Sequence, residues 1–321
     1  MGTTQPTTGR TPALQPIVSP VEDLVAKLKL RPNKYPCAVK LSVRGEAKHV
    51  DWDFSKAPFR TLELIQITDV QWGSRACRTE RVIEYRDWVL SAPNRFMIWT
   101  GDNIDAATMQ SKGTTWDNTG NPQQQLFEFC ELWAPARHRI LGYVGGNHER
   151  RAITTFGDLG ITIAALLRVP YSSGIQHIDV HFGKHQPFPI TQWHGSGGAR
   201  TKGTVAQKPS RFAGDNYTSK LCLMGHLHQA LCIPVWGMQR DKQGDLRLVK
   251  QIAAMGSSFL DVFGSYAEVA GYAPSDVMMP RCVLEKSGGW EVSLRSFAWV
   301  MLSVGASQWL SLTHAISSLV S

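Results

Sequence analysis

Six side chains of the kinds that bind divalent metal ions stand at or just after the ends of short apolar segments. They are two aspartates, one asparagine and three histidines: Asp69, Asp102, Asn147, His194, His226 and His228. Any one of them alone would usually be part of a turn or a helix cap. A site for two ions needs about five to seven such ligands, with one carboxylate bridging ions roughly 3.5 to 4 Å apart. Together, these six residues predict a dinuclear metal site.

The segment Gly225-His226-Leu227-His228 carries two of these side chains on alternate residues. Alternate residues of an extended segment point to the same side, and the glycine permits a close turn. On its own the segment is also compatible with a solvated turn. Beside the other candidate ligands, it supplies two imidazoles on one side of the predicted site.

The apolar segments before these residues are expected to be strands of one layered α/β domain. The expected strands are residues 39–43, 62–67, 95–99, 139–144, 190–193 and 221–224, and the expected helices are residues 79–90 and 122–133. Five of these strands end near a metal-ligand type of residue, as expected for a site beyond the carboxyl ends of a sheet. Residues 251–295 are expected to add strands and loops that complete a second sheet.

The 321 residues are long enough for one large domain, which we place at residues 21–295. Residues 1–20, rich in Thr, Pro and Gln, lack a signal-peptide pattern and are expected to form a flexible leader. Residues 296–321 contain no charged side chain, but polar residues interrupt them too often for a stable membrane span. They are expected to form an apolar helix or tail that packs on its own domain or on a partner in a homo-oligomer, with contact to a membrane surface as the alternative.

The formal net charge of +8 favours acidic partners such as phosphate esters, DNA or RNA. The six cysteines are scattered and form no C-x-x-C pair, which predicts reduced thiols in a cytoplasmic compartment. The sequence has no G-x-S-x-G motif and no local signature of a catalytic cysteine, which argues against a covalent serine or cysteine nucleophile.

Five segments of the sequence resemble, in order, the motifs of the calcineurin-like metallophosphoesterase superfamily. They are Thr68-Asp69-Val70-Gln71, Gly101-Asp102-Asn103-Ile104-Asp105, Gly146-Asn147-His148-Glu149, Trp193-His194-Gly195 and Gly225-His226-Leu227-His228. The resemblance spans residues 69–228, about half of the chain. It implies a layered α/β/β/α sandwich of two sheets flanked by helices, and hydrolysis of phosphate esters by a metal-activated water.

The resemblance also implies which residues hold each ion. One ion would be held by Asp69, Gln71, Asp102 and His228, and the other by Asp102, Asn147, His194 and His226. His148 would not bind metal but would face the substrate, where it stabilises charge or protonates the leaving alkoxide. Gln71 departs from the superfamily, which usually has histidine there. Its neutral amide predicts weaker binding of the first ion and favours Mn²⁺ or Mg²⁺ over Zn²⁺, with Fe also compatible.

Two further resemblances bear on the substrate. Asp105 completes a G-D-x-x-D pattern that is similar to double-strand-break-repair nucleases, and it alternatively orients a neighbour through a hydrogen bond. Segments such as Gly142 to Arg151 and His194 to Gly203 resemble phage and prophage phosphoesterases, which would place the chain in the host cytoplasm. They favour a phosphodiesterase or nuclease; the alternatives are a phosphomonoesterase and a degenerate member that binds metal or nucleic acid without turnover.

Residues 195–220 carry five basic residues against one acid, a formal charge of +4. A basic, Gly-rich loop there would hold a phosphate of the substrate; the alternative is a solvated surface loop. Arg200 and Lys202 are the nearest candidates in this segment, and Arg150 is a similar candidate after His148.

Overall fold

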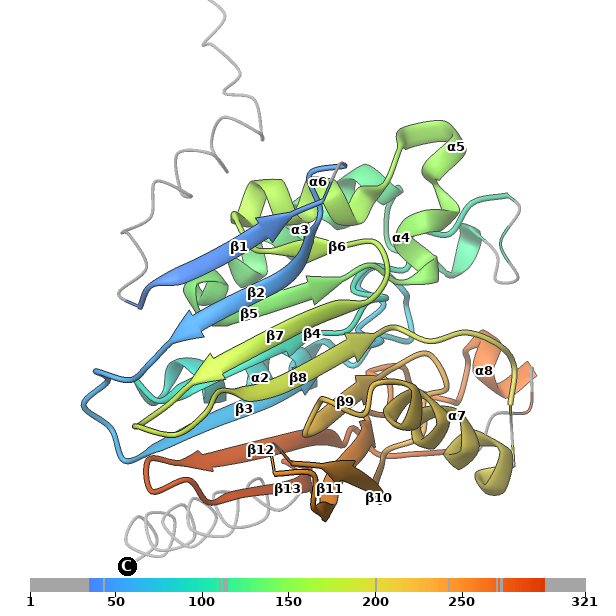
Figure 1. Ribbon diagram of the computed structural model, residues 1–321. Coiled ribbons are helices and arrows are strands. Elements are labelled where there is room, and N and C mark those ends of the chain that lie inside the picture. The colour runs from blue at the N-terminus through green and yellow to red at the C-terminus, as the bar shows by residue number, and fades with distance from the viewer. Residues whose placement is uncertain are drawn as a thin grey trace, which may run out of the picture.

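The fold consists of two packed sheets with helices on both outer faces (Figure 1). The computed structural model describes residues 35–42, 44–109, 111, 115–199, 201–241, 243–269, 271 and 274–297. Within these residues the chain forms one sheet of seven strands and one of six.

The seven-stranded sheet is mixed and has the order β1-β2-β7-β8-β9-β11-β10. Its strands are β1 (Cys37–Leu41), β2 (Ala47–Asp53), β7 (Gln176–His181), β8 (Phe188–Trp193), β9 (Leu221–Met224), β11 (Leu246–Met255) and β10 (Leu231–Arg240). Strands β8, β9 and β11 run parallel to one another. The carboxyl ends of β8 and β9 therefore lie at the same edge.

The six-stranded sheet has the order β13-β12-β3-β4-β5-β6. Its strands are β13 (Trp290–Arg295), β12 (Met279–Glu285), β3 (Thr61–Ile67), β4 (Arg95–Trp99), β5 (Ile140–Val144) and β6 (Tyr171–Ser172). Strands β3 to β6 are parallel, whereas β12 runs antiparallel to β3. The segments after β3, β4 and β5 thus meet at one edge of this sheet.

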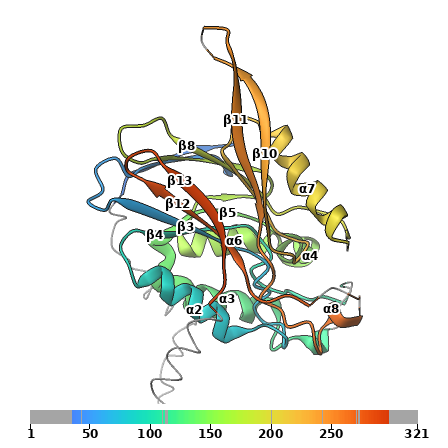
Figure 2. The same cartoon turned by 90° about the horizontal axis from the view of Figure 1, so that it is seen from below.

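Apolar side chains fill the space between the sheets and the space under the helices. Leu64 and Phe96 of one sheet pack with Ile178 and Ile190 of the other. Helices α2 (Thr79–Leu90), α3 (Pro122–Trp133) and α6 (Leu159–Leu167) cover the outer face of the six-stranded sheet. Helix α7 (Lys202–Asp215) packs on β9 and β11 on the opposite side (Figure 2). The predicted α/β/β/α layering is confirmed.

Helix α3 illustrates why the sequence forms these elements. Asn121 caps the helix by accepting a hydrogen bond from the backbone of Gln124 at 2.9 Å, and Pro122 begins the first turn. Leu126, Phe129 and Trp133 recur at helical spacing and are buried. The remaining helical elements are η1 (Thr115–Asp117), η2 (Ala134–Arg139), α4 (Asn147–Arg151), α5 (Ile153–Phe156) and α8 (Tyr266–Val269).

The structure corrects two expectations about the later part of the chain. Residues 195–220 do not form one loop: most of them belong to α7, because Val205, Pro209, Phe212 and Ala213 are buried at helical spacing. The region 251–295 does not complete a single sheet. Its β11 joins the seven-stranded sheet, while β12 and β13 extend the other one beside β3.

Strands β10 and β11 form a long hairpin that projects beyond both sheets (Figure 2). Trp236, Met238, Leu246 and Leu248 are exposed on it. In the register of the hairpin Met238 pairs with Leu248 and Arg240 with Leu246, so these side chains share one face.

The two predicted terminal segments lie almost entirely outside the described residues. The leader, residues 1–20, and all of the C-terminal segment after Phe297 lie outside the described residues. In the part of the chain that is described, no helix combines the length and the apolar character needed to cross a membrane. All six cysteines are described, and all are free thiols.

Candidate metal centre

The predicted ligands lie just after strands, in loops or, for Asn147, at the start of α4, and most of them have an unusual backbone conformation. Among the described residues other than glycine, seven have positive φ, and five of these are predicted ligands: Asp69, Gln71, Asp102, His226 and His228. Residues with a side chain rarely adopt this left-handed region, at a cost of about 1 kcal/mol or more each. The surrounding hydrogen bonds hold it: the backbone N–H of Gln71, for example, donates to the carbonyl of Asp102 at 2.9 Å.

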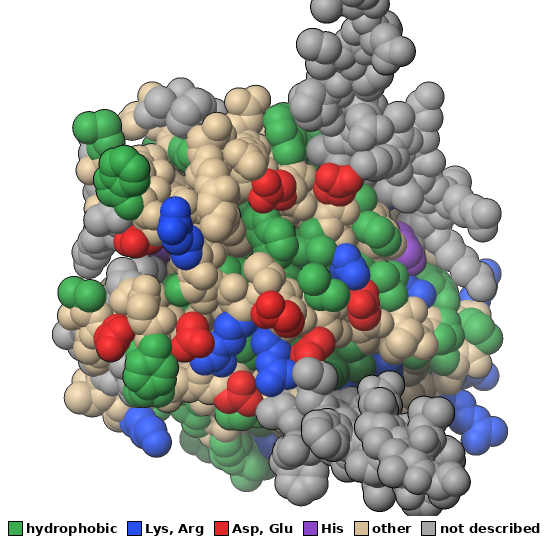
Figure 3. Space-filling model, turned by 180° about the vertical axis from the view of Figure 1, so that it is seen from behind, with side chains coloured by type: hydrophobic (Ala, Val, Ile, Leu, Met, Phe, Trp, Pro, Cys, Tyr) green, Lys and Arg blue, Asp and Glu red, His purple; other side chains and the backbone are tan. Residues whose placement is uncertain are grey.

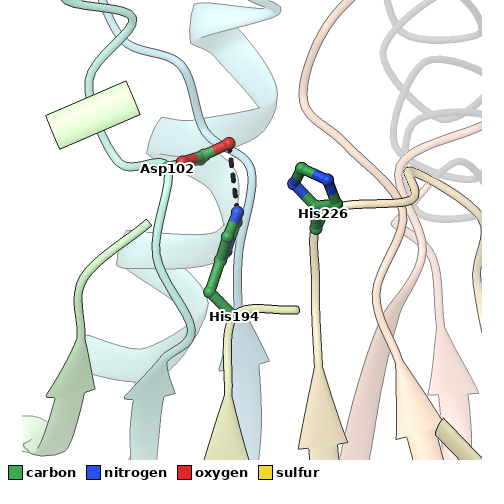
Figure 4. Close-up of side chains that lie close together, drawn as sticks. All are labelled: Asp102, His194 and His226. Carbon is green, nitrogen blue, oxygen red and sulfur yellow. Dashed lines mark ion pairs between the residues drawn. The ribbon is translucent and has the colours of Figure 1, made fainter. Parts of the chain in front are cut away.

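Asp102, Asn147, His194 and His226 form one group at the junction of the two sheets. His194 Nε2 lies 3.2 Å from Asp102 Oδ2 and 3.2 Å from Asn147 Oδ1. The His226 ring lies 5.2 Å from that of His194, measured between centroids. Ligand-type atoms of Asp102, His194 and His226 all lie within 4.8 Å of one another (Figure 4).

Hydrogen bonds to the backbone fix the orientation of both imidazoles. His194 Nδ1 donates to the carbonyl of Thr100 at 2.6 Å, so Nε2 faces Asp102 and Asn147. His226 Nε2 donates to the carbonyl of Gly197 at 2.8 Å, which leaves Nδ1 as the available nitrogen. Metal-binding histidines are commonly held in this way through the nitrogen that does not bind metal.

Asp69, Gln71 and His228 form a second, adjoining group. His228 Nε2 lies 3.1 Å from Asp69 Oδ1 and 3.3 Å from Gln71 Nε2. The carboxylate of Asp69 also accepts a hydrogen bond from Thr68 Oγ1 at 2.6 Å and one from the backbone of His226 at 3.0 Å. The backbone of the loop that carries His226 is therefore hydrogen-bonded directly to Asp69, which follows β3.

The electrostatics of both groups favour a cation. Burial alone would raise the pKa of Asp69 and Asp102, but His228 lowers that of Asp69, and His148 and His194 lower that of Asp102. Both carboxyl groups therefore have pKa values below their usual range. Burial alone would lower the pKa of His194, but Asp102 raises it to about 10. A metal ion bound at His194 Nε2 would take the place of that proton.

His148 lies beside the first group. Its backbone N–H donates to Asp102 Oδ1 at 2.9 Å, and its Nδ1 lies 2.8 Å from Asp105 Oδ1. Its Nε2 lies 2.7 Å from Arg151 Nη2. Because a guanidinium group only donates, Nε2 accepts here, and Nδ1 carries the proton that is donated to Asp105. The contact fits the reading of Asp105 as a residue that orients its neighbour.

Glu149, to which the sequence assigns no role, joins the loops of the site. Its carboxylate is fully buried and accepts from the backbone of Asp102 at 3.1 Å, Asn103 at 2.7 Å and Gly146 at 3.1 Å. The sequence does contain a signal for this role of Glu149. The residue directly follows the Asn147-His148 pair, and a buried acid needs several hydrogen-bond donors.

The predicted substrate-binding residues lie outside this network. Arg150 is exposed on α4 and forms no hydrogen bond or ion pair within the described ranges, whereas its neighbour Arg151 contacts His148. Lys202 is exposed at the first turn of α7. Arg200 lies outside the described residues.

The donor set fits divalent metal ions. Two buried carboxylates, two amide groups and three imidazoles converge, and the hydrogen bonds of His194 and His226 leave one nitrogen of each directed to the site or available for a ligand. Carboxylate, amide and imidazole ligands suit Mn²⁺, Mg²⁺, Zn²⁺ and Fe²⁺. The first group offers four such side chains. The second offers two, together with the amide of Gln71.

Gly146 provides a test of how tightly the loops are packed. A Cβ at this position would collide with the Asp102 carboxylate and backbone. We expect Gly146→Ala to displace Asp102 and lower metal affinity by roughly 10- to 100-fold, in line with changes to groups that support metal ligands. Isothermal titration with Mn²⁺ measures this effect. Gly214→Ala in α7, where a Cβ meets nothing within 4 Å, is the control, and equal losses in both variants would contradict the argument.

Comparisons with known proteins find only solved structures that have low sequence identity to this chain. No protein-family model matches the chain, and no curated protein matches it. Similar solved structures include a predicted phosphoesterase of Streptococcus pneumoniae, with 14% identity, 74% of this chain and 99% of that chain covered, and a TM-score of 0.31. Vps29 of Chaetomium thermophilum has 10% identity over 73% of this chain and 96% of its own, with a TM-score of 0.34. GAP50, the anchor in the inner membrane complex of Plasmodium, has 9% identity over 74% and 85%, with a TM-score of 0.35.

Proposed function

We propose that the chain is a metal-dependent phosphoesterase that hydrolyses phosphodiesters. The observation that carries the proposal is the convergence of Asp102, Asn147 and His194 at 3.2 Å, beside His226 and next to the group of Asp69 and His228. These side chains follow five strands of the two sheets: β3, β4, β5, β8 and β9. Such a cluster of buried carboxylates and oriented imidazoles has a clear chemical use in holding cations.

The residues that would hold the ions follow the two groups. Asp69, Gln71, Asp102 and His228 would hold one ion, and Asp102, Asn147, His194 and His226 the other. When bound, divalent ions supply Lewis-acid activation of the phosphate and of the attacking water. We propose Mn²⁺ as the native ion because the set contains amide and carboxylate oxygens and lacks cysteine.

His148 would act on the leaving group. Its Nδ1 is held by Asp105, so Nε2 is the atom that can face a substrate oxygen. Arg151 donates to that nitrogen at 2.7 Å and can equally donate to an anionic phosphate oxygen. We propose that a bound phosphate takes over the guanidinium of Arg151, so that the freed Nε2 of His148 takes up a proton from water and delivers that proton to the leaving oxygen.

A phosphodiester or nucleic-acid substrate is supported by the charge around α7. Lys202, Lys208 and Arg211 lie on this helix against one acid, Asp215, and Lys208 donates to the carbonyl of Ser196 in the loop after His194. On the face opposite to that of Figure 1, acidic and basic side chains are interspersed where they are visible (Figure 3). The basic residues of α7 lie between the predicted ligands His194 and His226 in the sequence. They are our candidates for attracting a polyanion.

The test is a substrate screen with the purified full chain and Mn²⁺. We expect release of nitrophenol from bis-p-nitrophenyl phosphate and cleavage of single-stranded DNA, and both activities should disappear in EDTA. Hydrolysis of p-nitrophenyl phosphate alone would assign the chain to the phosphomonoesterases. Absence of hydrolysis with any divalent ion would overturn the proposal.

Gln71 favours a second candidate, a member that binds metal without turnover. Its amide lies where an imidazole would complete the second group. We expect Gln71→His to raise the affinity of the weaker Mn²⁺ or Zn²⁺ site roughly tenfold, because imidazole is a better donor than a neutral amide. Two-site calorimetry measures this, with Gln243→His in an exposed turn as the control. If only Gln71→His hydrolyses phosphodiesters, the second candidate is correct.

A further inference from the structure

A cavity of about 560 Å³ lies away from the metal centre, between β1 and β2 of one sheet and α6 and η2 of the other layer. Figure 1 shows β1, β2 and α6 at the edge of the molecule where β6 also lies. The volume falls within the range of about 300 to 1,000 Å³ that is typical of small-molecule sites. None of the predicted metal ligands lines it.

The inner wall of this cavity is apolar. Ala47, Trp52, Ile140, Ala164 and Val169 line it, and all five are buried. The indole N–H of Trp52 already donates to the carbonyl of Leu141 at 2.8 Å, so Trp52 offers apolar surface to a ligand. Such a wall favours a hydrocarbon or aromatic body over a polar one.

Three arginines line the same cavity. Arg44 and Arg168 are exposed and Arg137 is half-buried, and none of the three forms an ion pair within the described part of the chain. The one acid in the lining, Glu46, is already paired with Lys48 at 2.5 Å. The cavity therefore combines an apolar wall with unpaired positive charge.

Arg137 is the arginine whose surroundings most need an anion. Its Nε is buried without a hydrogen-bond partner, and Nη1 only reaches the carbonyl of Leu167 at 3.5 Å. Burial and the positive charge of Arg168 both lower the pKa of Arg137. Two guanidinium groups that repel each other beside a buried donor form an environment that a carboxylate or phosphate would stabilise.

We propose that this cavity binds an amphiphilic anion, with an apolar body against Trp52 and Ile140 and an anionic head on Arg137 and Arg168. The ligand would be a soluble molecule of the size of a medium-chain fatty acid. This site is independent of the proposed phosphoesterase centre, and its ligand need not be a phosphate ester.

The test uses decanoate, which is not a phosphate ester, and the full chain in EDTA, so that the metal centre takes no part. We expect decanoate to bind in calorimetry and octanoate to bind roughly tenfold more weakly, because it lacks two methylene groups. Decyltrimethylammonium has the same chain with a positive head and should not compete. Arg137→Gln and Arg168→Gln should each weaken decanoate binding roughly tenfold, the usual effect of losing a charged hydrogen bond.

Matched variants separate the proposal from general effects. Arg211→Gln changes an arginine that is 87% exposed on α7 and should leave decanoate binding unchanged. Ala165→Trp adds bulk from an exposed position that lines the cavity and should abolish binding without unfolding the chain. The proposal is overturned if Arg137→Gln, Arg168→Gln and Ala165→Trp bind decanoate like the wild type, or if decyltrimethylammonium competes equally. Loss of phosphodiester hydrolysis would not bear on it.

Discussion

Asp102→Asn is expected to reduce hydrolysis of bis-p-nitrophenyl phosphate by about 10³-fold, equivalent to about 4 kcal/mol of transition-state stabilisation. Asp102 is the carboxylate that would serve both ions in the proposed site. Its Oδ2 lies 3.2 Å from His194, and its Oδ1 accepts from the backbone of His148 at 2.9 Å. Asparagine keeps the size of the side chain but removes the negative charge, and its amide group donates where an acceptor is needed.

Metal content measured beside the rate distinguishes this explanation from loss of the fold. We expect the variant to bind fewer than two Mn²⁺ ions per chain while its circular dichroism stays that of the wild type. Asp215→Asn on α7, where the carboxylate is 70% exposed, should keep both activity and metal. Full activity of Asp102→Asn would refute the proposed metal centre.

His148→Ala is expected to lower turnover by roughly 10²- to 10⁴-fold, the usual contribution of a general acid, with both metal ions retained. His148 is only 2% exposed, and Asp105 holds its ring at 2.8 Å. Asp105→Asn should lie between the wild type and His148→Ala, because it loosens the ring without removing it. The measurement is turnover at saturating Mn²⁺, with metal content from the same samples.

A substrate with a better leaving group gives this prediction a second readout. Protonation matters less when the leaving group is a nitrophenolate than when it is an alkoxide, so His148→Ala should harm cleavage of DNA more than cleavage of bis-p-nitrophenyl phosphate. His185→Ala, at an exposed turn, is the control. Equal losses on both substrates would contradict the role given to His148.

The strands that position the candidate site could be predicted because each is a short apolar run. Strands β4 and β9 and helices α2 and α3 have the bounds expected from the sequence. Strands β2 and β7 were missed, although both alternate in the manner of a half-buried strand. In β2, Val50 and Trp52 are buried, while His49 and Asp51 lie on the other face.

The assignment of strands to sheets could not be predicted, because it depends on pairings between distant residues. Arg281 of β12 pairs with Ile65 of β3, while β11, the strand that precedes β12 in the chain, joins the other sheet. Local composition also hid α7, because residues 195–220 are basic and rich in glycine, which predicts a loop. Its buried positions follow the helical period nevertheless, and this weaker signal was available.

The types of ligand in the candidate site could be predicted from the sequence. The residues that hold these ligands and their loops in place could not. Asp69, Asp102, His194 and the two histidines of the 225–228 segment could be chosen because they follow apolar runs. The contact of Arg151 with His148, and the clamp that Glu149 makes on three backbone N–H groups, depend on how loops from different strands meet. Residue type and spacing do not specify such contacts.

The left-handed backbone at Asp69, Gln71, Asp102, His226 and His228 has a consequence for protein engineering. Glycine would adopt the same conformations without steric cost, so a sequence selected for thermal stability alone would be expected to place glycine or asparagine at these positions. Thermostability screens of this chain should therefore enrich glycine at position 71 or 228. The resulting proteins would unfold at a higher temperature but bind metal ions with lower affinity.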